Sequence, residues 1–136
     1  MAVGNEGKRY HTDQTHFLRK DVSFSDNGTT VTVGKLPPGA IVVGAGVIVS
    51  TAFNAGTSNV LDIGTSGDGD GFATDLALGT IGNIVWDELA TSNDLYATTE
   101  VTVTADVALS GTAATAGTGH VYVEYIPVDP AIAATA

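Results

Sequence analysis

The sequence predicts an all-β protein: an antiparallel, jelly-roll-like β-sandwich of about seven or eight strands with an extended N-terminal arm. Threonine, alanine, valine and glycine dominate the composition, which suits sheets and tight turns better than helices. Short segments of alternating apolar and polar residues are separated by turn signals roughly every 8–15 residues, as in a sandwich. No segment shows the periodicity of a strong amphipathic helix.

The length of 136 residues indicates one domain, which we expect to span residues 19–128. Residues 1–18 are polar, with few large apolar side chains, so they cannot bury enough surface to fold alone. We expect them to form an arm, either disordered or ordered on a neighbouring subunit, and residues 129–136 to form a tail. The candidate partner-binding residues are basic and aromatic: Lys8, Arg9, Tyr10, Phe17, Arg19 and Lys20.

The first expected strands run from Lys20 to Ser25 and from Thr29 to Leu36. Asn27-Gly28, between them, supplies the positive φ of a primed turn, so we expect the two strands to pair as a hairpin. Pro37-Pro38-Gly39 ends the second strand, because proline fixes φ and glycine permits the reversal.

The long apolar strand Ala40–Phe53 and the strand Val60–Gly64 are expected to form the central hairpin of the sandwich, joined by the loop Asn54–Asn59. The beginning of the long strand does not alternate, which predicts that both of its faces are covered. Gly44 and Gly46 share one face and predict a bulge or a close approach to the backbone.

Four further segments complete the expected strands. The first is either a strand or a short helical turn, and the third shows the clearest alternation in the chain. The segments are Phe72–Leu78, Ile81–Trp86, Thr98–Ser110 and His120–Pro127.

Charge is distributed unevenly along the chain. The net charge is −10, yet residues 1–35 hold all five basic residues against four acids, whereas residues 36–136 hold eleven acids and no base. An acidic body repels phosphate, so we expect no nucleic-acid partner. The asymmetry indicates either attraction between one chain's N-terminus and a neighbour's body, or acids that only confer solubility.

Two compositional features limit location and chemistry. There is no cysteine, hence no disulfide, thiolate nucleophile or cysteine–metal site. The longest apolar run, Ile41–Val49, is too short for a membrane helix, and the first 30 residues lack the apolar core of a signal peptide. We therefore expect a soluble protein made in the cytoplasm, with no membrane partner.

The loop Asp68-Gly69-Asp70-Gly71 is the sharpest local signal, because alternate carboxylates can converge on Ca²⁺. The calcium-loop pattern is not met, since Phe72 and Gly79 occupy ligand positions. We favour a tight turn over a calcium site. The histidines His11, His16 and His120 also lack metal-ligand spacing, so no metal or cofactor is expected.

No catalytic motif is present. The serines lack a nucleophile-elbow context, the acidic pair Asp87-Glu88 is adjacent in sequence rather than opposed across a cleft, and no glycine-rich segment carries a phosphate-binding lysine. We therefore expect no enzyme. Trp86 and Tyr122 are candidate sugar-stacking platforms, which leaves a carbohydrate- or receptor-binding β-sandwich module as the alternative interpretation.

Four short segments follow one another in roughly residues 30–75: Leu36-Pro37-Pro38-Gly39-Ala40-Ile41-Val42, Val49-Ser50-Thr51-Ala52-Phe53-Asn54-Ala55-Gly56-Thr57, Leu61-Asp62-Ile63-Gly64-Thr65 and Asp68-Gly69-Asp70-Gly71-Phe72. In this order they resemble small structural proteins of tailed bacteriophages, which include capsid decoration, or cement, proteins with jelly-roll-like folds.

The resemblance implies a non-enzymatic virion structural protein that binds and stabilises the shell formed by the major capsid protein. It places the protein on the capsid surface after synthesis in the host cytoplasm. A homo-oligomer, either a dimer or a trimer, is expected with it, because closed symmetric assembly multiplies weak contacts.

Overall fold

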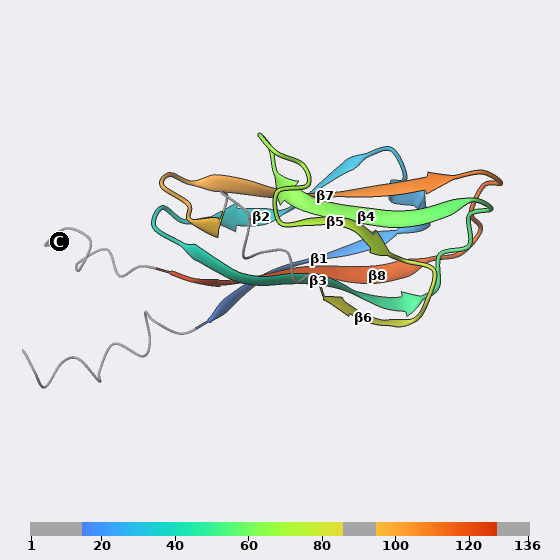
Figure 1. Ribbon diagram of the computed structural model, residues 1–136, viewed down its shortest axis with the longest axis horizontal. Helices are drawn as coiled ribbons and strands as arrows, with labels where there is room; N and C mark the ends of the chain where they lie inside the picture. The colour runs from blue at the N-terminus through green and yellow to red at the C-terminus, as the bar shows by residue number, and fades with distance from the viewer. Residues whose placement is uncertain (1–14, 86–94, 128–136) are drawn as a thin grey trace, which may run out of the picture.

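The computed structural model describes residues 15–85 and 95–127, and this part of the chain forms eight β-strands and one short 3-10 turn (Figure 1). The elements are β1 (His16–Ser23), η2 (Phe24–Asp26), β2 (Thr30–Leu36), β3 (Ile41–Thr51), β4 (Ser58–Thr65), β5 (Ala73–Ala77), β6 (Gly82–Val85), β7 (Val101–Ser110) and β8 (Thr118–Ile126). No helix in these residues is long and apolar enough to cross a membrane.

The strands form two four-stranded sheets that lie face to face (Figure 1). Sheet I has the order β1-β8-β3-β6 and sheet II the order β2-β7-β4-β5. The first strand pairs with the eighth, the second with the seventh, the third with the sixth and the fourth with the fifth, always antiparallel. A long ribbon of strand pairs rolled in this way is a jelly roll, which confirms the predicted antiparallel sandwich.

The core lies between the two sheets and is built from the inward residues of each strand. The alternation predicted for the seventh strand is confirmed, because Val103, Ala105 and Val107 are buried. Leu61 and Ile63 of β4 are also buried, as expected. The segment for which strand and helical turn were both open forms β5.

The predicted central hairpin is wrong. Its first strand became β3 in sheet I and its second strand became β4 in sheet II. The connecting residues cross between the sheets and hydrogen-bond to distant segments: Phe53 N donates to Leu78 O, and Thr57 N donates to Ser110 O. The length and composition of this loop suit a hairpin within one sheet and a connection between two sheets equally well. The loop sequence alone therefore does not distinguish these two connections.

The predicted first hairpin is also wrong. Asn27 has φ −53° and ψ 127°, Gly28 has φ 77°, and Thr29 N donates to Asp26 O at 2.9 Å. This is a type II turn, in which only the second central residue needs a positive φ. It carries the chain from sheet I to sheet II, whereas the primed turn of a hairpin would have kept both strands in one sheet.

Strand β1 begins at His16, four residues before the expected start at Lys20. It pairs along its whole length with β8, from His16 opposite Tyr125 to Ser23 opposite Thr118. Phe17 and Leu18 therefore belong to the sheet. Residues 1–14 lie outside the described part, so the division into arm, body and tail stays a prediction.

The aspartate–glycine loop after β4 forms the tight turn that we favoured. Thr65 N donates to Asp68 O at 2.8 Å and Asp68 N donates to Thr65 O at 3.1 Å. The loop folds back over Gly64 so closely that a Cβ there would lie 2.1 Å from Asp68 O. Only glycine fits under this turn.

Candidate partner-binding surfaces

The outer face of sheet II is acidic and rich in hydroxyl groups. Asp62 of β4 lies directly opposite Asp106 of β7, and Asp106 Oδ1 accepts a hydrogen bond from Thr30 Oγ1 at 2.6 Å. Asp62 Oδ1 accepts a hydrogen bond from the backbone N–H of Asp75 at 2.7 Å. Carboxylates set opposite one another on a sheet are stable only when well hydrated, so this face suits contact with water.

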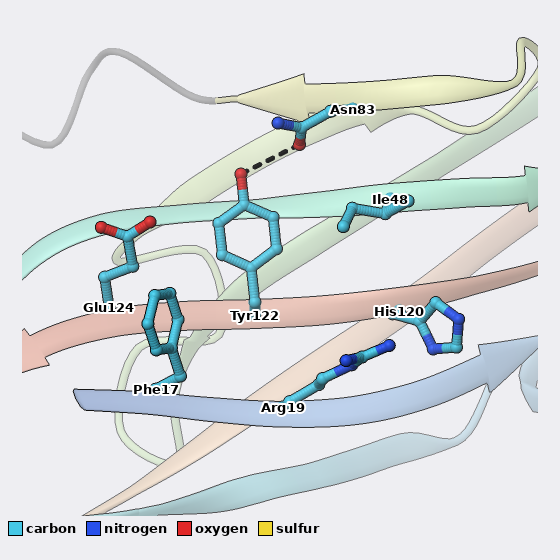
Figure 2. A pocket seen from close by; sticks show the side chains of 7 residues that line it. All are labelled: Phe17, Arg19, Ile48, Asn83, His120, Tyr122 and Glu124. Carbon is cyan, nitrogen blue, oxygen red and sulfur yellow. Dashed lines mark hydrogen bonds between the residues drawn. The ribbon is translucent and has the colours of Figure 1, made fainter. Parts of the chain in front are cut away.

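The outer face of sheet I has a different character, because it exposes large apolar side chains. Phe17 of β1 is 61% exposed, Ile48 of β3 is 42% exposed and Val85 of β6 is 60% exposed. Between them lies a shallow groove of about 500 Å³ (Figure 2). The groove is lined by Phe17, Arg19, Ile48, Asn83, His120, Tyr122 and Glu124.

Two glycines of β3, Gly44 and Gly46, lie against Glu124 and Tyr122, two of the side chains that line the groove. A Cβ at Gly46 would lie 2.6 Å from Tyr122 Oη and 2.6 Å from Ile84 O, so the Tyr122 ring lies against a bare backbone. The Tyr122 hydroxyl donates a hydrogen bond to Asn83 Oδ1 at 2.9 Å and so bridges from β8 to the edge strand β6 (Figure 2). With the bulge between Val42 and Gly44, this confirms both consequences predicted from the glycines.

The groove carries a positive and a negative side chain, and neither is neutralised within it. Among the described residues, no ion pair involves Arg19 or Glu124. Figure 2 shows the rings of Phe17 and Tyr122 between the Arg19 guanidinium and the Glu124 carboxylate. His120 is different, because its Nδ1 is hydrogen-bonded to Asp21 Oδ1 at 2.5 Å.

A second exposed apolar cluster, the terminal cluster, lies at the end of the sandwich where β1 begins and β8 ends (Figure 1). It consists of Ile41 (43% exposed), Val43 (46%) and Tyr96 (55%). Ile41 bridges to Tyr96 and pairs with Ile126, the last residue of β8. Both terminal segments of the chain therefore join the sandwich next to this cluster.

The expected site residues fall into three groups. Lys8, Arg9 and Tyr10 lie outside the described residues. Phe17 and Arg19 line the groove. Lys20 is exposed on β1 at the edge of sheet I, between Arg19 and Asp21.

Sequence reasoning did not find Ile48, Asn83 and Glu124 as members of one site. Strand alternation does indicate that Glu124 points outward, because Val123 is apolar. Which side chains meet depends on the strand order, which local patterns do not contain.

Ser50, which lies on β3 close to β8, does not show the link to a base that nucleophilic catalysis requires. Ser50 Oγ lies 2.8 Å from Thr118 Oγ1, and among the described residues no hydrogen bond joins it to His120. A serine nucleophile needs such a contact with its base. In the same part of the chain, no three His, Asp or Glu side chains gather as a metal site. Trp86, Asp87, Glu88 and His11 lie outside it.

Comparison with known proteins identifies the fold. No family model matches the sequence, and no curated protein matches it. A chain in the structure of the cyanophage Pam1 capsid asymmetric unit is similar with a TM-score of 0.65 and 22% identity, over 85% of this chain and 86% of that one.

Two further phage structures contain similar chains. One in the capsid of Ralstonia phage GP4 has a TM-score of 0.65 and 18% identity, over 87% of each chain. One in the acidic stable capsid structure of Helicobacter pylori bacteriophage KHP30 has a TM-score of 0.51 and 18% identity, over 82% of this chain and 86% of that one. At these identities the likeness shows a shared fold.

Proposed function

We propose that this chain is a virion structural protein of a tailed bacteriophage, and that it acts as a capsid decoration protein that binds and stabilises the shell of the major capsid protein. The observation that carries the proposal is the terminal cluster, an exposed apolar surface at the end where both terminal segments join the jelly roll. The similar chains in three phage capsid structures support it.

The distribution of polar groups favours attachment to a shell over formation of one. A shell-forming subunit contacts neighbours around its whole circumference, whereas the outer face of sheet II is lined with carboxylates such as Asp62 and Asp106 that suit water. Eleven acids without a base in residues 36–136 would also repel packaged nucleic acid. Both features fit a position on the outside of a particle.

The contact with the shell would combine the arm with the terminal cluster. Lys8, Arg9 and Tyr10 supply charge and an aromatic anchor, and the segment that carries them enters the sandwich at the same end as Ile41 and Tyr96. Such a role needs no catalytic group, cofactor or metal.

The test uses capsid shells assembled without this protein. Purified wild-type chain should co-sediment with the shells and raise their melting temperature. Tyr96→Ser and Ile41→Ser should weaken binding about tenfold or more, because each removes an apolar anchor. Ile81→Ser is the matched control, since Ile81 is 66% exposed and lies outside the terminal cluster. Wild-type chain that neither sediments with shells nor changes their stability would refute the proposal.

A further inference from the structure

We infer that the outer face of sheet I binds a second copy of this chain, so that two grooves face each other in a two-fold symmetric dimer. This inference goes beyond the proposed function, because it uses the groove residues rather than Ile41, Val43 and Tyr96 of the adjoining terminal cluster, and it needs no shell. It assigns a site to three exposed apolar residues that lie outside the terminal cluster: Phe17, Ile48 and Val85.

Four side chains on two neighbouring strands carry the inference. In the register of β1 with β8, Phe17 lies opposite Glu124 and Arg19 lies opposite Tyr122. All four line the groove, so they project from the same face of the sheet. They form a square in which one diagonal is aromatic, Phe17 with Tyr122, and the other is charged, Arg19 with Glu124 (Figure 2).

This square is complementary to itself. A two-fold axis in the plane of the interface, along the aromatic diagonal, exchanges the two corners of the charged diagonal. Arg19 of one copy then faces the partner's Glu124, while the aromatic rings pack on those of the other copy. A two-fold contact requires this kind of self-complementary patch.

The contact would pair two charged groups that have no ion-pair partner in the described part of one copy. Within the described residues, neither Arg19 nor Glu124 takes part in an ion pair, and a guanidinium facing a carboxylate forms strong, directional hydrogen bonds. Ile48 and Val85 flank the square on β3 and β6 and would lose their exposure to water. Any other protein would have to present the same pattern of charges and rings.

Size and net charge are compatible with a dimer of modest affinity. Four strands at about 4.8 Å spacing and about 3.3 Å per residue give a face of roughly 500 Å² per copy, near the lower limit for a specific interface. The carboxylates on the outer face of sheet II lie more than one sheet spacing, about 10 Å, behind this face, which is at least the distance over which salt screens charge.

The test is the oligomeric state of the full chain, measured by sedimentation equilibrium without shells. Wild type should form a dimer. Arg19→Glu and Glu124→Arg should each weaken it about tenfold or more, because each places like charges opposite one another at two symmetric positions. The double variant should restore dimerisation. Lys35→Glu is the matched control: it makes the same charge change in the ion pair with Glu100, away from the groove, and should leave the dimer unchanged.

Glu124→Arg separates a specific contact from general repulsion. It lowers the magnitude of the net charge, so repulsion alone would make this variant associate more tightly, whereas the inference predicts weaker association. Tighter association, a wild-type monomer at every concentration up to the solubility limit, or a trimer would overturn the dimer. Glycan-array binding that is lost in Tyr122→Ala would overturn it too, by assigning the groove to sugar. A monomer that still binds shells would refute this inference and leave the proposed function intact.

Discussion

Replacing Gly46 by alanine should destabilise the fold, although alanine is the smallest change possible at this position. Gly46 lies in the middle of β3, and a Cβ there would lie 2.6 Å from Ile84 O, 2.6 Å from Tyr122 Oη and 2.9 Å from Tyr122 Cζ. Atoms do not approach this closely without a shift. The Tyr122 ring can rotate away, but Ile84 O belongs to the backbone of β6 and moves only if that edge strand moves.

The expected cost is that of overpacking, about 1–3 kcal/mol in the free energy of unfolding. For a domain of this length, each kcal/mol lowers Tm by about 4 °C. Gly79→Ala is the matched control, because a Cβ at Gly79 meets nothing within 4 Å. That substitution should be neutral or stabilise by about 0.4–1 kcal/mol through the unfolded state.

A double-mutant cycle in urea separates the two contacts at Gly46. Tyr122→Ala removes the ring, so Gly46→Ala should cost less in that background, with the remainder due to Ile84 O. If Gly46→Ala is as stable as wild type, then the close approach of Tyr122 to β3 is wrong, and so is the position given to the Tyr122 ring in the groove. If the cost is identical in both backgrounds, the backbone of β6 alone sets it.

Three further outcomes follow from the structure. Leu61→Ala should cost about 2–5 kcal/mol in urea unfolding, because Leu61 is fully buried; a cost below about 1 kcal/mol would contradict its place in the core. Deleting residues 1–14 should leave Tm nearly unchanged, whereas deleting 1–18 should lower it, because Leu18 of β1 packs against the core; equal Tm values would contradict the position of β1. Ca²⁺ should raise Tm no more than Mg²⁺ does, since backbone hydrogen bonds close the loop from Thr65 to Gly71; a calcium-specific rise that is lost in Asp70→Ala would contradict this.

The strands were predictable from sequence, but the division of the strands between two sheets was not. Alternation around Val103 and Val107 reports which residues face a core, because side chains alternate along any strand. It does not report which strand is the neighbour. Asn27-Gly28 and the loop that begins at Asn54 illustrate this limit. Each has the composition of a hairpin turn, yet each connects one sheet to the other. Long-range hydrogen bonds hold these connections, such as the one that Leu109 N donates to Asn27 Oδ1.

The groove could not be predicted from the sequence either, because local patterns do not report which strands are neighbours. It brings together β1, β8, β3 and β6, which span the chain from Phe17 to Glu124. The glycines at 44 and 46 did predict a close approach, because a missing side chain is a local signal. The identity of the approaching group, Tyr122, depends on the register between β3 and β8, which is a property of the folded sheet.

One expectation fails in a way that bears on function. The apolar run that opens β3 predicts a strand covered on both faces, yet Ile41 and Val43 are 43% and 46% exposed in the single chain. Within residues 15–85 and 95–127, no side chain covers these apolar positions fully, and Tyr96 beside them is 55% exposed. In natural proteins, the local sequence pattern disagrees with the fold mainly at functional sites. The missing cover is therefore best supplied by another protein, which is the role that the proposed function gives to the capsid shell.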